Sequence, residues 1–224
     1  PTLSWRSSCR MGVCGSCAMF INGKPRLACA NQVAHLGGGK VVVKPLPNYD
    51  IIRDLVPDLE PFFAKHAAIK PFLIRKNVEE LENPSGEFFQ SREELINYIQ
   101  FAYCIKCGAC LAACPTVATD ASFLGPQALA QAWRYTSDSR DEGAAERGKE
   151  VFTAHGAFRC HFAGACSDVC PKGVDPAFAI QLMKQFMFRE KLGGCKDKHG
   201  TEVAPPVENW TPREGIPKPP DHSV

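Results

Sequence analysis

The sequence predicts an α+β fold in two parts, an N-terminal part with short strands and a C-terminal part built only from helices. Eleven of its 12 cysteines fall into three runs along the 224 residues. Two strand-like segments, 18–21 and 24–28, flank the hairpin signal Asn22-Gly23 inside the first run. Helix start signals accompany the second and third runs. These three observations place the strands early in the chain and the long helices after them.

Composition and charge narrow the class of protein. The chain has 26 Lys and Arg against 24 Asp and Glu, a net charge of +2, which argues against a nucleic-acid partner. No apolar run approaches the roughly 18 residues of a transmembrane helix, so we expect no membrane span in this chain. Cysteines at C-x2-C spacings without a secretory segment indicate metal binding in a reducing compartment.

The first cysteine run has the C-x4-C-x2-C…C spacing of plant-type [2Fe–2S] ferredoxins. Glycines and a serine between its cysteines let backbone N–H groups approach the inorganic sulfurs. The hairpin returns the chain to this loop, and residues 41–43 predict a further buried strand. We therefore expect a plant-type ferredoxin portion of the β-grasp kind. Its predicted [2Fe–2S] ligands are Cys9, Cys14, Cys17 and Cys29.

The segments on either side of this portion carry two further expectations. A plant-type ferredoxin needs strands upstream of Cys9, and the chain opens on Pro1, so we expect an N-terminal segment before it. Between residues 44 and 83 repeated prolines break up any long element and predict short helices, one of them at 49–55.

The second and third runs are two copies of one pattern. Residues 104–115 have the C-x2-C-x2-C-x3-C-P spacing of bacterial-type ferredoxins, and residues 160–171 repeat it with Ala163 in place of one cysteine. In two-cluster ferredoxins the fourth cysteine of a run ligates the other cluster, so the fourth cysteines exchange sites. The predicted sets are Cys104, Cys107, Cys110 and Cys170 for [4Fe–4S], and Cys114, Cys160 and Cys166 for [3Fe–4S].

Other interpretations of these cysteines stay open. A three-thiolate site suits [3Fe–4S] because an iron without a ligand is easily lost, but a [4Fe–4S] cluster with water or His161 on the fourth iron is also compatible. Disulfides or zinc ligands explain the repeated pattern less well. Cys195 is left over and is expected to be a plain thiol.

Turns and composition predict the domain boundaries. The turn-rich segment 83–86 separates a [2Fe–2S] domain with its bridging segment, 1–83, from a helical domain with two clusters, 84–194. The Pro-rich residues 195–224 form a C-terminal tail.

Two helices are predicted ahead of residue 140. A capping box starts one at Ser91, and its apolar positions lead into the second cysteine run. Pro126 suits the first turn of the other, which directs Leu129, Ala132 and Trp133 inward.

Two more helices follow. One runs from Asp141 to near His155, with its charged side chains in solvent. The other starts at the N-cap Asp175, carries an apolar stripe, and ends at Gly193-Gly194.

Three different clusters in one chain, without a recognisable flavin or nucleotide motif, indicate an electron relay rather than a catalytic site. The same chain resembles the iron–sulfur subunit of succinate dehydrogenase and fumarate reductase from about residue 3 to residue 187. The motifs that carry the resemblance are Ser8-Cys9-Arg10-Met11-Gly12-Val13-Cys14-Gly15-Ser16-Cys17, Asn22-Gly23-Lys24, Pro45-Leu46-Pro47, Ile52-Arg53-Asp54-Leu55, Tyr103-Cys104, Gly125-Pro126, Asp138-Ser139-Arg140-Asp141 and Cys170-Pro171-Lys172-Gly173.

The resemblance implies a subunit of an oxidoreductase of the tricarboxylic acid cycle or of fumarate respiration. It implies an FAD-containing flavoprotein subunit and a transmembrane anchor with quinone as partners, at the cytoplasmic face of the bacterial inner membrane. Electrons would pass between FAD and quinone through [2Fe–2S], [4Fe–4S] and [3Fe–4S], in either direction. Family positions on the quinone side match Pro115 and His161, although a histidine there also fits a plain subunit interface.

The resemblance also bears on the quinone. Many ubiquinone-reducing members carry tryptophan where this chain has Thr119, and segment 125–143 looks nearer to fumarate reductases, which favours a menaquinone-linked enzyme. Two alternatives remain. One is the iron–sulfur subunit of another flavoprotein complex, such as a thiol-linked fumarate reductase, and the other is a zinc-binding structural module.

Overall fold

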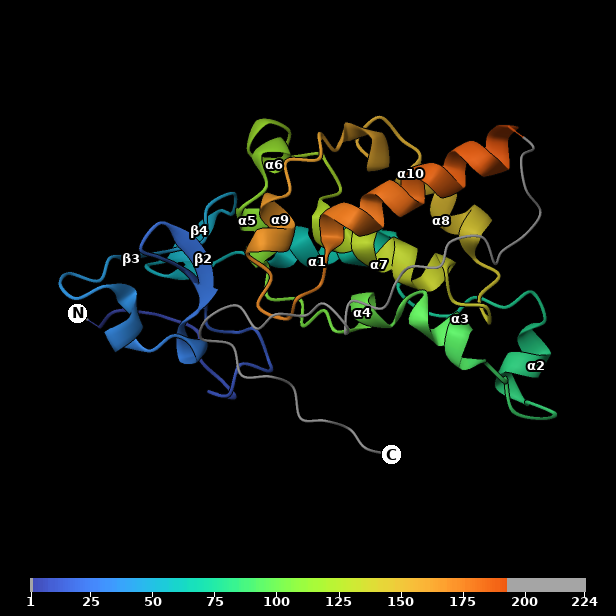
Figure 1. The fold of residues 1–224 in the computed structure, drawn as a ribbon, viewed down its shortest axis with the longest axis horizontal. Coiled ribbons are helices and arrows are strands. Elements are labelled where there is room, and N and C mark those ends of the chain that lie inside the picture. Colours follow the sequence, from blue (N-terminus) through green and yellow to red (C-terminus); the bar gives the residue numbers. More distant parts are fainter. Residues whose placement is uncertain (1, 193–224) are drawn as a thin grey trace.

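The computed structural model describes residues 2–192 and has the two parts that the sequence predicts. Short strands gather at one end of the molecule and helices fill the rest (Figure 1). The fold class is therefore α+β, with a small N-terminal sheet region and a helical C-terminal part. The predicted helix end at Gly193-Gly194, the thiol Cys195 and the tail 195–224 lie outside the described residues.

The N-terminal sheet is built on the predicted hairpin. Strand β1 (Ala18–Ile21) pairs antiparallel with β2 (Lys24–Leu27). The turn residues Asn22 and Gly23 both have positive φ, +46° and +83°, as the tight hairpin turn requires. Two short 3-10 helices follow, η1 (Ala28–Ala30) and η2 (Val33–Leu36). The first of them brings Cys29 back to the cysteine loop.

The third strand differs from its prediction. Strand β3 (Val43–Lys44) pairs antiparallel with β1 and gives the sheet order β2-β1-β3. The predicted burial of segment 41–43 is wrong, since Val42 and Val43 are 42% and 40% exposed. Because β3 lies at the sheet edge and has only two paired residues, one side of this segment faces solvent.

The predicted helix at 49–55 is also wrong. This segment holds strand β4 (Ile51–Arg53), which pairs antiparallel with β5 (Val56–Pro57). Asp54 has a φ of +51°, a left-handed conformation that turns the chain and that a helix does not accept. The next element is the predicted kind of short helix, α1 (Glu60–Ala68), with a proline in its first turn.

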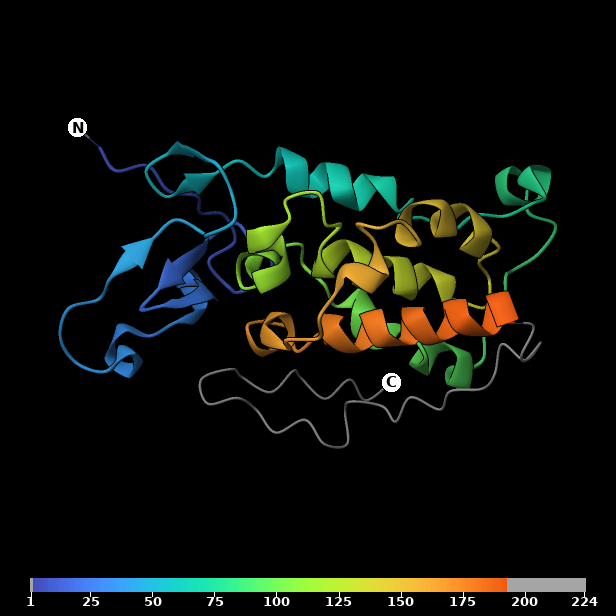
Figure 2. The ribbon, with the colours of Figure 1, turned by 90° about the horizontal axis from the view of Figure 1, so that it is seen from above.

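The helical part consists of short helices around two longer ones. Helices α7 and α10 pack side by side through the middle of this part, as Figure 2 shows. Most of the buried apolar side chains belong to one core around them, to which α1 contributes Phe62. The elements are α2 (Val78–Glu82), α3 (Arg92–Ile96), α4 (Ile99–Ala102), α5 (Ala109–Ala112), α6 (Pro115–Thr119), α7 (Pro126–Thr136), α8 (Ala144–Val151), η3 (Ala157–Arg159), α9 (Ala165–Asp168) and α10 (Pro176–Leu192).

Three predicted helix starts are confirmed. Ser91 forms the capping box with Glu94 ahead of α3, and Pro126 lies in the first turn of α7. Asp175 accepts a hydrogen bond from the backbone N–H of Phe178 at the start of α10. The predicted inward residues of α7, namely Leu129, Ala132 and Trp133, are buried.

The helix predicted from Ser91 does not continue into the second cysteine run. It breaks between α3 and α4 at Tyr98, whose φ of −135° is not helical. The break lets the Tyr98 ring become buried, and its hydroxyl donates a hydrogen bond to Gln90 at 2.6 Å. Burial of this ring therefore outweighs the helical pattern of the segment.

The charged side chains of the helix predicted from Asp141 do not all lie in solvent, because Asp141 and Arg147 form a buried ion pair. Helix α8 begins at Ala144 rather than Asp141 and ends at Val151. The carboxylate of Asp141 accepts two hydrogen bonds from the Arg147 guanidinium, at 2.6 and 2.8 Å, and Arg147 is only 1% exposed. Arg147 also donates to the carbonyl oxygens of Lys70 and Phe72, and the N–H of Ile74 donates to Asp141. The pair thereby fastens the chain ahead of α2 to the start of α8.

Arg147→Met should lower the free energy of unfolding by about 3–5 kcal/mol, because it leaves the Asp141 carboxylate buried without its cation. The measurement is chemical denaturation of the cluster-loaded protein, followed by circular dichroism. Lys149→Met on the same helix is the control, since its ion pair with Glu146 is exposed and contributes little. Equal midpoints for the two variants would contradict the structural role of the pair.

Candidate iron–sulfur sites

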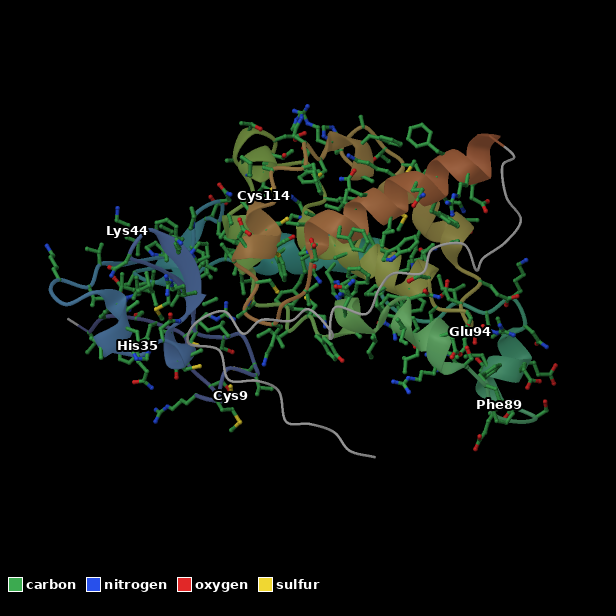
Figure 3. The ribbon with its side chains drawn as sticks, viewed as in Figure 1. Cys9, His35, Lys44, Phe89, Glu94 and Cys114 are labelled. Atoms are coloured by element: carbon green, nitrogen blue, oxygen red, sulfur yellow. The ribbon has the colours of Figure 1, made fainter. Side chains whose placement is uncertain are left out.

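Cys9 lies at the β end of the molecule (Figure 3), and hydrogen bonds to sulfur connect the loop that carries it with the other cysteines of the first run. Backbone N–H groups point at their sulfurs. The N–H of Gly12 donates to Cys29 Sγ at 3.3 Å, and the N–H of Cys14 donates to Cys9 Sγ at 3.3 Å. Cys17 Sγ accepts from the N–H of Cys29 at 3.5 Å. Such donors stabilise negative charge on sulfur, so the loop fits a thiolate-bound [2Fe–2S] cluster.

Two thiols of this first site differ in acidity. Cys14 Sγ accepts hydrogen bonds from the Ser16 hydroxyl, which has the larger effect, and from the backbone N–H of Cys9. These bonds lower the pKa of Cys14 to about 6. Burial raises the pKa of Cys17. The exposed Cys14 is therefore the thiol of this pair that is more readily deprotonated for metal binding.

Four cysteines of the later runs surround one hollow. Cys104, Cys107 and Cys110 of the second run line it together with Cys170 of the third. Its volume is about 400 Å³, including space open to solvent. Four thiols around one space are the donor set of a [4Fe–4S] cluster, so these residues fit that group.

A second hollow lies where the remaining three cysteines meet. Cys114 of the second run faces Cys160 and Cys166 of the third, and Ala163 is part of the same lining. The volume is about 320 Å³, including space open to solvent. Three thiols with a methyl group in the fourth place suit a cluster that lacks one protein ligand. Within residues 2–192, no three His, Cys, Asp or Glu side chains are grouped as a single metal ion would need.

The two runs fold alike, which explains why Ala163 lies where a cysteine would. In each run a residue with positive φ, Lys106 at +55° or Phe162 at +58°, precedes that place. A glycine with positive φ follows it, Gly108 at +82° or Gly164 at +75°, and each glycine leads into a four-residue helix, α5 or α9. The position of Ala163 thus corresponds to that of Cys107.

Burial makes several thiols of the second and third runs weak acids. It raises the pKa of Cys107 and of Cys166 to about 12, and the pKa of Cys110 lies well above its ordinary value for the same reason. Bound iron would stabilise the thiolates and release their protons.

The N-terminal part contacts the backbone of the second run. Gly15 has a φ of +76°, and a Cβ atom there would lie 2.8 Å from Cys107 Cβ and 2.9 Å from Cys107 Cα. The side-chain amide of Asn48 donates to three carbonyl oxygens at the end of α5, at 3.0 to 3.2 Å. The Tyr49 hydroxyl donates to the carbonyl of Gly108 at 3.0 Å. The first two cysteine sites are therefore in direct contact.

Sequence reasoning missed Asn48 and Tyr49 as docking residues. The pattern around them carries no signal for a function, because their partners lie about 60 residues further along the chain. The nearest motif in the sequence is Pro45-Leu46-Pro47, which directly precedes them.

The predicted quinone-side residues lie near the three-thiolate hollow. Pro115 is part of its lining and is exposed. His161 is exposed in the loop between Cys160 and Cys166, where its neighbour Phe162 lines the hollow. Thr119, on α6, is exposed as well, and its hydroxyl donates to the carbonyl of Thr116 at 3.1 Å.

Two protein families match this chain, and each is a family of iron–sulfur domains. The "2Fe-2S iron-sulfur cluster binding domain" family matches residues 1–64, and the "4Fe-4S dicluster domain" family matches residues 100–174. The chain is thus an iron–sulfur protein with a [2Fe–2S] part and a [4Fe–4S] part.

Similar proteins of known function show to which kind of iron–sulfur protein the chain belongs. The chain is 50% identical to the fumarate reductase iron–sulfur subunit of Mycobacterium tuberculosis, over 82% of this chain and 73% of the relative. It is 45% identical to that of Haemophilus influenzae, over 82% and 75%. It is 41% identical to the succinate dehydrogenase iron–sulfur subunit of Paracoccus denitrificans, over 84% and 71%. The chain belongs to the family of succinate dehydrogenase and fumarate reductase iron–sulfur subunits, which are parts of oxidoreductases.

A solved structure has the same fold. A chain of the Mycobacterium smegmatis Sdh1 complex in the apo form is similar with a TM-score of 0.69 at 28% identity, covering 86% of this chain and 80% of that one. None of the helices in residues 2–192 has the length and apolar character that crossing a bilayer requires.

Gly15→Ala should disturb the contact between the first two sites, because the new methyl group would overlap the backbone of Cys107. We expect weaker magnetic interaction between the two clusters in EPR spectra and a stability loss larger than the ~1–2 kcal/mol of left-handed strain alone. Gly23→Ala is the matched control, since its φ is +83° and a Cβ there would meet nothing within 4 Å. Equal effects of the two substitutions would show that strain, not contact, matters at Gly15.

Proposed function

We propose that this chain relays single electrons between FAD in a flavoprotein subunit and quinone at a membrane anchor. The observation that carries the proposal is the order of the cysteine sites. The first site lies at the β end, the four-thiol hollow touches it through Gly15 and Cys107, and the three-thiol hollow follows beyond α5. Bound iron–sulfur clusters supply one-electron chemistry, so adjacent sites form a path.

The ligand assignment is part of the proposal. Cys9, Cys14, Cys17 and Cys29 hold [2Fe–2S]. Cys104, Cys107, Cys110 and Cys170 hold [4Fe–4S], and Cys114, Cys160 and Cys166 hold [3Fe–4S]. The two hollows support the exchange of Cys114 and Cys170, and the methyl group of Ala163 supports the missing fourth iron.

Exposed apolar side chains at both ends support two partners. Met11 is 73% exposed and Val13 is 53% exposed in the loop between Cys9 and Cys14. Phe162 is exposed in the lining of the three-thiol hollow, and Phe158, two residues before Cys160 in the chain, is exposed as well. Apolar side chains exposed around a redox site indicate docking surfaces. We assign the first end to the flavoprotein and the second to the anchor, where Pro115 and His161 lie on the quinone side.

If the second end binds a membrane anchor, the chain lies at a membrane surface. We propose that the chain lies at the cytoplasmic face of the bacterial inner membrane, held there by the anchor subunit. Thr119, exposed on α6, and the similarity to fumarate reductase subunits favour menaquinone as the quinone. The domain division at 83–86 and the tail from 195 remain predictions.

Low-temperature EPR of the whole complex tests this function. We expect a three-iron signal in the oxidised sample that disappears when succinate is added, while a reduced [2Fe–2S] signal appears. Succinate reaches these clusters only through a flavin partner, so this result supports both the cluster set and the donor. Clusters that form but do not respond to succinate would favour a different flavoprotein partner.

Cys170→Ser should remove the [4Fe–4S] signal and spare the three-iron signal, although Cys170 belongs to the third run. Cys166→Ser, four residues earlier on α9, is the matched variant and should remove the three-iron signal instead. Ala163→Cys should convert the three-iron cluster to a four-iron cluster by supplying the missing thiolate. EPR and iron analysis measure all three, and the reverse result for the two serine variants would refute the exchange of ligands.

A further inference from the structure

The carboxamide of Gln127 is a buried polar group that the relay described above does not use. Gln127 lies in the first turn of α7, is 2% exposed, and is part of the lining of the four-thiol hollow. Its Nε2 atom is 3.1 Å from His66 Nδ1 on α1, and Cys104 lines the same hollow as Gln127. Its Oε1 atom is buried with no hydrogen-bond partner among the described residues.

The partners of Gln127 decide how its amide is oriented. The amide nitrogen has two hydrogens, and one of them goes to His66 Nδ1. The second hydrogen is left for the thiolates that line the hollow, of which Cys104 is one. This orientation leaves the carbonyl oxygen without a partner among the described residues, a cost that a charge-assisted hydrogen bond to a bound thiolate would offset.

His66 has the properties of the acceptor that this orientation needs. Burial, and after it the charge of Lys106, lowers the pKa of His66 to about 4. The imidazole is therefore neutral at pH 7, and its Nδ1 atom accepts the hydrogen of Gln127 when the ring proton is on Nε2. The hydrogen bond to His66 then fixes the side chain of Gln127 beside Cys104.

An N–H donor at a cluster sulfur has a different effect on the two redox states. Reduction adds one negative charge to a cluster and its thiolates, so an N–H···S hydrogen bond is stronger in the reduced state. We propose that Gln127 is a positioning residue that raises the reduction potential of the cluster bound by Cys104, and that His66 holds it in place. This inference rests on the ligand set of the proposed function.

The test is a redox titration of the [4Fe–4S] EPR signal in the whole complex that carries Gln127→Met. Methionine keeps the volume of glutamine and removes both donors. We expect the ratio of reduced to oxidised cluster at a fixed potential to fall about tenfold, which is about 59 mV for a one-electron couple. The potentials of the other two clusters should not change.

Gln131→Met is the matched control. Gln131 is a buried glutamine one turn further along α7, and its Nε2 atom donates to the carbonyl of Phe101 at 2.8 Å, away from the hollow. It should lower stability without shifting the potential. His66→Leu keeps the Gln127 amide but releases it, so we expect a smaller shift in the same direction as Gln127→Met.

Three outcomes separate the possibilities. An unchanged potential in Gln127→Met would overturn the inference, and so would equal shifts in Gln127→Met and Gln131→Met. If Gln127→Met does not assemble, Gln127→Leu also removes both donors, and it must lower the potential for the inference to hold. A native complex without a [4Fe–4S] signal, or one in which Cys170→Ser leaves that signal intact, would instead refute the ligand set.

Discussion

The exchange of one cysteine between two similar runs is the constraint on which the helical part depends. Cys170 completes the lining of the hollow made by the second run, and Cys114 does the same for the third. For both to happen, α5 and α9 must face each other, and the long helices α7 and α10 hold them in that arrangement. Clusters bound by these cysteine sets would join segments that are distant in the sequence, and would thereby couple cluster binding to folding of this part.

The β end is joined to this arrangement by a close backbone approach and by side chains that donate to main-chain carbonyls. Gly15 meets Cys107 without a side chain between them, and Asn48 satisfies three carbonyl oxygens at the end of α5. Close approach shortens the path between the first two clusters, and hydrogen bonds to main-chain carbonyls fix the orientation. On the other side of the helical part, the buried pair of Asp141 and Arg147 fastens the segment between α1 and α2. Both contacts act on the geometry of the relay rather than on its chemistry.

The environments of the three sites differ in ways that separate their roles. The first site is rich in N–H donors and partly open to solvent, while the four-thiol hollow is lined by partly buried thiols and the buried amide of Gln127. The three-thiol hollow has the exposed Phe162 in its lining. Hydrogen bonds to sulfur, burial and nuclearity are the protein's means of setting each potential.

The sequence alone determined three local features, which are the hairpin at Asn22-Gly23, the capping box at Ser91 and the start of α7. Each of them depends only on residues within a few positions of one another. The exchange of Cys114 and Cys170 as cluster ligands stays a prediction from the repeated pattern, and the linings of the two hollows support it. Tertiary structure alone decided the burial of Arg147, the break at Tyr98 and the meeting of Gln127 with His66 and Cys104. Those outcomes depend on partners from distant segments, and sequence spacing does not specify which side chains packing will bring together.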